Sequence, residues 1–150
     1  MSFKAACIQN SATPDIAHDI GVLTRLIRDA AARGARFIAT PEYCAGLDTR
    51  DGLLYPVAPA EHEHPVLPAM AALARELESW ILIGSIGVKA SDGRINNRSY
   101  MMKPDGIIAA RYDKIHMFDV NLGAGKVYRE SATIAPGNLA SVFNDTSILI

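Results

Sequence analysis

The chain has 150 residues, of which 49% are hydrophobic and 21% are charged, and its formal net charge is −1. This is the composition of an ordinary globular domain, and it excludes the basic surface of a protein that binds nucleic acid or anionic membranes. The start, MSFKAACIQN, lacks the apolar stretch of a signal peptide, and the chain's two cysteines form neither a disulfide framework nor a zinc spacing. We therefore expect one cytoplasmic domain without nucleic-acid or membrane partners.

Strand and helix patterns alternate along the first half of the chain. The apolar run FKAACIQ at 3–9 predicts a buried strand, with Cys7 as a small buried hydrophobe. A helix follows, with Thr13 as N-cap, Pro14 at its first position and Gly34 at its end. Apolar runs predict two further strands, at 36–40 and 80–88, and helical periodicity predicts a second helix at 64–80.

The stretch 44–64 is rich in Gly, Pro, His and Asp and predicts an irregular loop that borders a functional site. Turn signals at 91–94 and 104–106 flank the segments 95–102 and 107–114, which predict paired strands. Strands that alternate with helices and then pair with one another indicate an α/β fold with a mixed sheet.

Two charged residues follow predicted strands. Glu42 comes directly after the strand at 36–40, where open α/β sheets build their ligand crevices, so it is a candidate general base. The alternative is a solvated, idle glutamate in a turn. Lys114 ends the strand at 107–114 and could stabilise an oxyanion, or it could be an ordinary surface lysine at a strand end.

Other candidates depend on their neighbours. Glu130 could share charge with Glu42 and Lys114 if the fold brings the three together, and alone it is an unremarkable loop glutamate. Cys44, two residues beyond Glu42, is the only internal candidate for a nucleophile, although residues so close in sequence at a turn rarely face each other. His62 and His64 show no third convergent ligand and predict an exposed polar loop rather than a metal site, and we assign His116 no role.

Five segments together resemble a known family. FKAACIQN, ARGARFIATPEYCAG, WILIGSIGVK, RINNRSYMMKPDGIIAARYDKIHMFDV and YRESATIAPGN resemble, in this order, the amino-terminal half of the nitrilase superfamily of carbon–nitrogen hydrolases. The branch of omega-amidase and related Nit-type amidases is the most similar. The resemblance implies part of an α-β-β-α sandwich with a mixed sheet and helices on one face.

The same resemblance implies roles for individual residues. Glu42 matches the family's general base, Lys114 matches the lysine that stabilises the oxyanion, and Glu130 matches a glutamate that orients this lysine and the substrate. Asn97 and Asp119 match positions of structural character. The family acts on non-peptide C–N bonds of small amides or nitriles, its members are commonly homo-oligomers, and no cofactor is implied.

The family's nucleophilic cysteine has no counterpart in this chain. The closing segment FNDTSILI predicts a strand that leads towards the nucleophile, so we expect residues 1–150 to form a partial hydrolase domain that ends before it. One hypothesis is a carbon–nitrogen hydrolase of amidase type with a Glu-Lys-Cys mechanism, whose cysteine lies beyond this chain. The alternative is an inactive truncated remnant that acts as a binding or assembly partner.

Overall fold

The computed structural model describes residues 3–50, 53–121, 123 and 127–144, and its centre is one five-stranded sheet in the order β1-β2-β5-β6-β7. β1, β2 and β5 are parallel, and β5, β6 and β7 are antiparallel. The bounds of these strands are Ala5–Cys7, Phe37–Ala39, Trp80–Lys89, Ile95–Met102 and Ile108–Asp113. The predicted mixed sheet is confirmed, as is the pairing of the segments at 95–102 and 107–114.

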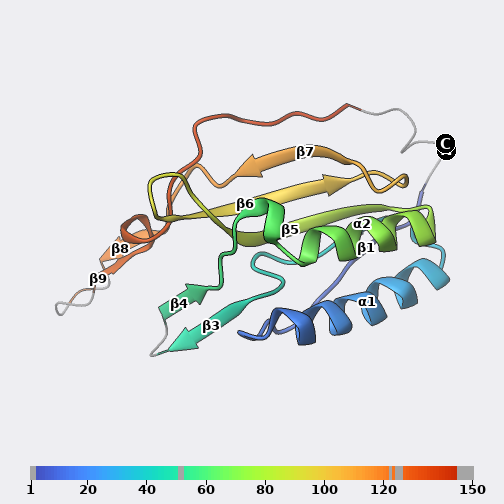
Figure 1. Cartoon of the computed structure of the whole chain (residues 1–150), viewed down its shortest axis with the longest axis horizontal. Coiled ribbons are helices and arrows are strands. Elements are labelled where there is room, and N and C mark those ends of the chain that lie inside the picture. The colour runs from blue at the N-terminus through green and yellow to red at the C-terminus, as the bar shows by residue number, and fades with distance from the viewer. Residues whose placement is uncertain (1–2, 51–52, 122, 124–126, 145–150) are drawn as a thin grey trace.

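Two helices, α1 (Ile16–Ala32) and α2 (Val66–Leu77), lie side by side on the same face of this sheet (Figure 1). The core between them and the sheet is built from large apolar side chains of both helices and of the central strands. Leu23, Ile27, Met70, Ile38, Ile81, Ile83, Ile86 and Met102 are all fully buried. The helices and this core fix the sheet as a rigid platform.

The start of α1 differs from its prediction. Asp15, not Thr13, is the N-cap, and its carboxylate accepts a hydrogen bond from the His18 amide at 3.0 Å. The Thr13 hydroxyl instead binds Asp19, a buried carboxylate that also accepts from the amide of Gly46. Thr13 was misassigned because either residue can cap a helix and the choice depends on the partner each finds in the fold.

Cys7 is exposed, so its predicted burial was wrong. β1 is an edge strand on which neighbouring side chains alternate between faces. Ala6 and Ile8 pack on the core beneath the helices, which leaves Cys7 on the opposite face.

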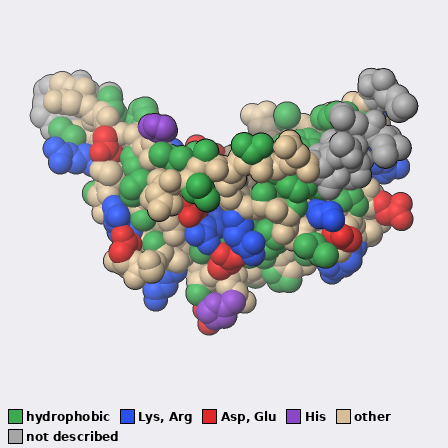
Figure 2. Space-filling view, turned by 90° about the horizontal axis from the view of Figure 1, so that it is seen from above, with side chains coloured by type: hydrophobic (Ala, Val, Ile, Leu, Met, Phe, Trp, Pro, Cys, Tyr) green, Lys and Arg blue, Asp and Glu red, His purple; other side chains and the backbone are tan. Residues whose placement is uncertain are grey.

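In the space-filling view of Figure 2, hydrophobic side chains gather along the hollowed side of the molecule, and acidic and basic side chains intermingle over the surface next to it.

The stretch predicted to be an irregular loop contains structure of its own. β3 (Leu47–Arg50) and β4 (Leu53–Pro56) form an antiparallel hairpin, and a 3₁₀ turn spans Glu61–Glu63. A second small hairpin, β8 (Asp119–Asn121) with β9 (Val127–Arg129), precedes a 3₁₀ turn at Glu130–Ala132. The sequence pattern had predicted neither hairpin.

The strand predicted for the closing apolar residues 148–150 lies outside the described residues. Among the residues that the structure describes, neither helix has both the length and the apolar character that a membrane crossing requires.

Candidate active site

Glu42 lies in a tight turn at the carboxyl end of β2, and Ser85 on β5 holds this turn in place. The Tyr43 amide donates to the Ser85 hydroxyl at 2.9 Å, and the Cys44 amide donates to the Ser85 carbonyl at 3.0 Å. Tyr43 has a φ of 46°, which is uncommon for a bulky residue. The hydrogen bonds to Ser85 stabilise this backbone conformation, and with it the direction in which Glu42 leaves the turn.

Gly84 makes the close approach of this turn to β5 possible. A Cβ atom at Gly84 would lie 2.1 Å from the Thr40 carbonyl oxygen, so only glycine fits there. The register of β5 against β6 shifts between Ile83 and Ile86, and in this irregular stretch the Gly84 amide donates to the Thr40 hydroxyl at 3.1 Å. The irregularity therefore attaches the Glu42 turn to the centre of the sheet.

Lys114 follows directly after β7, and its backbone is held on both sides. Its amide donates to the Asn97 carbonyl of β6 at 2.9 Å, and its carbonyl accepts from the Gly137 amide at 2.8 Å. The preceding residue, Asp113, accepts two hydrogen bonds from the guanidinium of Arg98, at 2.7 and 2.9 Å. Bidentate pairs of this kind have a well-defined geometry, so the strand end that carries Lys114 is well fixed.

Glu130 comes from the 3₁₀ turn after β9 and is buried. One of its carboxylate oxygens accepts from the Phe118 amide, and the other accepts from the Lys114 ammonium at 3.0 Å. The β8–β9 hairpin therefore brings this glutamate back to the end of β7.

The structure thus brings Glu42, Lys114 and Glu130 together. The Lys114 Nζ atom lies 3.2 Å from Glu42 Oε1 and 3.0 Å from Glu130 Oε1. The side chain of Glu42 is 58% exposed, that of Lys114 is 28% exposed and that of Glu130 is 7% exposed. Partial burial opposes the charge of Lys114, but the hydrogen bonds to Glu130 and Glu42 outweigh it and raise the pKa of Lys114.

Asn97 also belongs to this cluster, a contact that the sequence had not suggested. Its side-chain amide donates to Glu42 Oε1 at 2.7 Å, and the residue is only 3% exposed. Asp119, the other residue expected to be structural, accepts two hydrogen bonds from Ser131, which lower its pKa. It therefore fixes the 3₁₀ turn that begins at Glu130.

A cavity of about 600 Å³ opens beside the three charged groups. Its other walls are largely apolar and come from both hairpins and the segment between β7 and β8: Leu54, Phe118, Val120 and Tyr128. Leu54 belongs to the stretch at 44–64, which we had expected to border the site. A space of this volume with a few convergent polar groups is typical of a small-molecule site.

Neither Cys7 nor Cys44 lines this cavity. Cys44 is fully buried, and burial raises the pKa of its thiol to about 11, so the thiol is protonated at neutral pH. Cys7 lies on the edge strand β1. The structure therefore argues against Cys44 as a substitute nucleophile.

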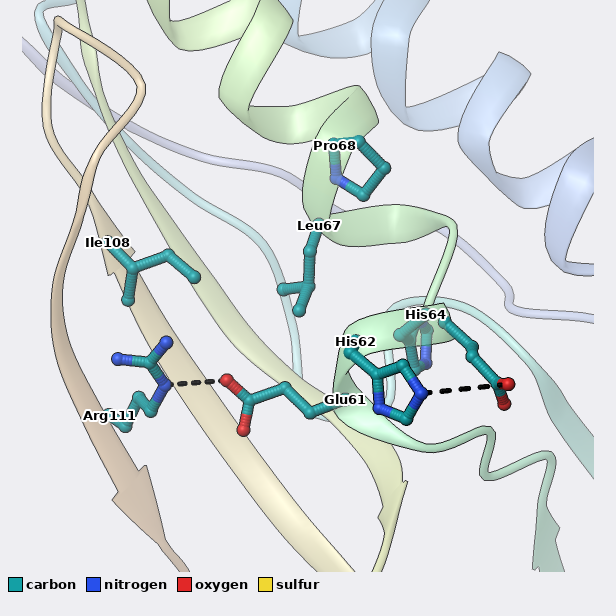
Figure 3. Close-up of a pocket in the computed structure, with 8 residues that line it drawn as sticks. Glu61, His62, His64, Leu67, Pro68, Ile108 and Arg111 are labelled. Carbon is teal, nitrogen blue, oxygen red and sulfur yellow. Dashed lines mark hydrogen bonds and ion pairs between the residues drawn. The ribbon is translucent and has the colours of Figure 1, made fainter.

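A second cavity, of about 570 Å³, lies between the start of α2, the 3₁₀ turn before it and β7 (Figure 3). Its charged groups already pair with one another, since Glu61 binds Arg111 at 2.7 Å and His62 lies 3.7 Å from Glu63. His62 is exposed as expected, but His64 is buried at the start of α2, where its Nδ1 atom accepts from the Val66 amide at 3.4 Å. This cavity lacks the cation between two carboxylates that marks the first one.

Among residues 3–50, 53–121, 123 and 127–144, no three His, Cys, Asp or Glu side chains are placed to hold a metal ion.

The family model described as carbon–nitrogen hydrolase matches this chain over residues 4–150. The chain is 28% identical to the omega-amidase NIT2 of Homo sapiens over 95% of its own length and 51% of the relative's. It is 31% identical to the deaminated glutathione amidase of Synechocystis sp. over 90% of its length and 50% of the relative's. The chain therefore spans about half the length of these curated relatives.

Solved structures share the fold. The NitFhit protein of C. elegans superimposes with a TM-score of 0.74 at 18% identity, over 89% of this chain and 33% of that one. A double mutant of the amidase from Nesterenkonia sp. AN1 in complex with acrylamide superimposes with a TM-score of 0.72 at 19% identity, over 91% and 49%. At these identities the likeness concerns the fold, which is that of the nitrilase superfamily.

Proposed function

Because this chain belongs to the carbon–nitrogen hydrolase family, we propose that it forms the acid–base and oxyanion side of an active site that hydrolyses the C–N bond of a small amide. The observation that carries the proposal is the position of the Lys114 ammonium between Glu42 and Glu130 at the edge of a cavity. A fixed cation next to an exposed carboxylate supplies two of the three groups that nucleophilic hydrolysis of an amide needs.

Glu42 is proposed as the general base. Its carboxylate lines the cavity and is more than half exposed, at 58% of the side chain, so a substrate or water can reach it. It would take the proton of the attacking thiol, deliver that proton to the departing ammonia or amine, and then deprotonate the water that hydrolyses the thioester.

Lys114 is proposed to stabilise the oxyanion of the tetrahedral intermediate. Its raised pKa keeps the ammonium protonated at neutral pH, so it can donate to the oxygen on which negative charge develops. Glu130 would hold the ammonium in position from the buried side, since one of its oxygens already binds the backbone of Phe118.

The nucleophile in this proposal is a cysteine outside the 150 residues, because Cys7 and Cys44 are the chain's only cysteines and neither lines the cavity. The thiolate sulfur forms a bond to the amide carbon, the C–N bond breaks with release of ammonia or an amine, and water then cleaves the acyl–sulfur bond. We keep the prediction that these residues are one part of a hydrolase domain.

A small amide is the substrate class that the cavity and the relatives support. The apolar walls suit a short acyl chain, two relatives are named omega-amidase and deaminated glutathione amidase, and a structural neighbour was solved with acrylamide. A cytoplasmic location and a homo-oligomeric state remain predictions, which fractionation and light scattering would test.

The proposal is tested by ammonia release from short aliphatic amides, with the protein as its gene encodes it. We expect turnover in the wild type that is unchanged in Cys44→Ala, because that thiol is buried away from the cavity. No ammonia above the blank from any amide tested would overturn the hydrolase proposal and favour the alternative of a binding or assembly partner.

A further inference from the structure

Asn97 binds the candidate base and the candidate cation at the same time. Its side-chain Nδ2 donates to Glu42 Oε1 at 2.7 Å, and its backbone carbonyl accepts from the Lys114 amide at 2.9 Å. Glu42 lies 55 residues away in sequence, so this contact is made only by the fold. One residue of β6 thus connects the turn after β2 with the end of β7.

The two oxygens of the Glu42 carboxylate are not equivalent. Oε1 accepts from both Asn97 and Lys114, at 2.7 and 3.2 Å. In the part of the chain that the structure describes, no donor binds Oε2, and the side chain is 58% exposed where it lines the cavity. A carboxylate held by one oxygen presents the other oxygen, with its lone pairs, to whatever enters the cavity.

The hydrogen bond from Asn97 is well suited to fix this orientation. Its donor is neutral, its acceptor is charged, and its length of 2.7 Å is short for an N–H donor. Asn97 is 3% exposed and sits in the middle strand of an antiparallel ladder, so its side chain has little freedom to move. The side chain of Glu42, by contrast, is 58% exposed, so its orientation depends on the hydrogen bonds from Asn97 and Lys114.

We propose that Asn97 is a positioning residue. Its hydrogen bond, together with that of Lys114, holds Oε1 of Glu42 and so directs Oε2 towards the cavity as the basic oxygen. This inference rests on the proposed function, because it assigns a purpose to the orientation of the base. It concerns the chemical step rather than substrate binding, since Asn97 does not line the cavity.

The direct test is Asn97→Leu in the protein as its gene encodes it. Leucine keeps the backbone link to Lys114 and a similar volume but cannot donate to Glu42. Loss of a hydrogen bond to a charged group is expected to lower kcat by about 10- to 100-fold. KM should change by less than about threefold, because the group acts on the transition state and not on binding.

The neighbouring asparagine provides a matched control. Asn96 lies on the same strand, its side chain points to the opposite face because neighbours on a strand alternate, and Asn96→Leu should retain the wild-type kcat. Asn97→Gln keeps an amide donor on a longer chain and should recover part of the loss. If Asn97→Leu fails to fold, Asn97→Ser serves instead, because a hydroxyl on so short a side chain does not reach Glu42.

The outcomes separate this inference from the proposed function. A wild-type kcat in Asn97→Leu, or a loss explained entirely by a smaller folded fraction in circular dichroism, would overturn the positioning role. In that case the hydrolase proposal would still be supported if the wild type releases ammonia and the Glu42→Gln variant does not. A wild-type protein without amidase activity would remove both.

Discussion

The two carboxylates that bind Lys114 lie in contrasting regions of the molecule. Glu42 stands on a turn attached to the central sheet, and its side chain is 58% exposed to the cavity. Glu130 stands on a peripheral hairpin and turn, yet its side chain is only 7% exposed and both of its oxygens are hydrogen-bonded. The rigid region therefore carries the accessible group, and the peripheral region carries the buried one.

This contrast indicates different functions for residues of the same type. A carboxylate that exchanges protons with substrate and water must be reachable, whereas one that orients a cation is most effective when it is buried and fully hydrogen-bonded. We therefore expect changes at Glu42 to affect activity, changes at Glu130 to affect stability, and changes at Lys114, which binds both, to affect activity and stability together.

Lys114→Met should have the largest combined effect. Removal of an oxyanion donor typically lowers kcat by about 10²- to 10³-fold, and the buried Glu130 carboxylate loses its counter-charge. Breaking a buried ion pair in this way costs about 3 kcal/mol of the free energy of unfolding. Steady-state kinetics and urea denaturation measure the two losses. Wild-type stability in Lys114→Met would contradict the claim that the buried Glu130 carboxylate depends on the Lys114 ammonium as its counter-charge.

A second substitution sharpens the same comparison. Adding Glu130→Gln to Lys114→Met removes the uncompensated charge, so we expect the double variant to regain about 1–2 kcal/mol of stability without regaining activity. The double-mutant cycle in urea gives the coupling energy. Additive losses at the two positions would mean that the 3.0 Å contact contributes no stability.

Glu130→Gln alone should have an intermediate effect. Glutamine keeps one acceptor oxygen for either Phe118 or Lys114 and turns an NH₂ donor towards the other, so one of the two hydrogen bonds is lost. We expect a loss of about 1–2 kcal/mol of stability and about a tenfold lower kcat. Thermal unfolding followed by circular dichroism provides the first value and ammonia release the second. A kcat as low as that of Lys114→Met would assign Glu130 a chemical role instead.

A rise to alkaline pH should have the smallest effect on the free energy of unfolding. The pKa of Lys114 is raised in the folded state, so its contribution to stability is present below about pH 10.4 and is lost as the pH rises through the folded pKa. Burial, followed by the charges of Glu130 and Glu42, raises the pKa of Tyr43, which also favours unfolding once tyrosine ionises in the unfolded chain.

Unfolding curves between pH 8 and pH 11 test this expectation. We expect a decline that is shallower in Glu130→Gln, which removes one partner of the ammonium, and in Tyr43→Phe, which removes the phenol. Stability that rises above pH 10 in the wild type would contradict both assignments.

The sequence was sufficient to predict where Glu42 and Lys114 lie but not why Glu130 matters. The first two follow apolar strands whose patterns are clear, and strand ends are natural places for a site. By pattern Glu130 was a loop glutamate that would matter only if the fold brought it to Glu42 and Lys114, and the family resemblance alone gave it a role. Its burial depends on the β8–β9 hairpin, whose strands Asp119–Asn121 and Val127–Arg129 are too short to show an alternating pattern.

The misassignment of Cys7 shares a cause with the missed contact of Asn97. Cys7 was expected to be buried because a short apolar strand does not reveal which of its faces a helix will cover. The side chain of Asn97 reaches Glu42 through a pairing between segments 55 residues apart, and no local pattern encodes that pairing. Local periodicity predicts elements well, but contacts between elements depend on the register that the whole fold selects.

The most direct test compares Glu42→Gln and Glu130→Gln side by side, in the protein as its gene encodes it, by kcat for ammonia release and by Tm. We expect Glu42→Gln to lower kcat by about 10³-fold with little change in Tm, and Glu130→Gln to lower Tm clearly with only about a tenfold loss of kcat. Equal losses of kcat with equal Tm values would contradict the division between an accessible base and a buried positioning carboxylate.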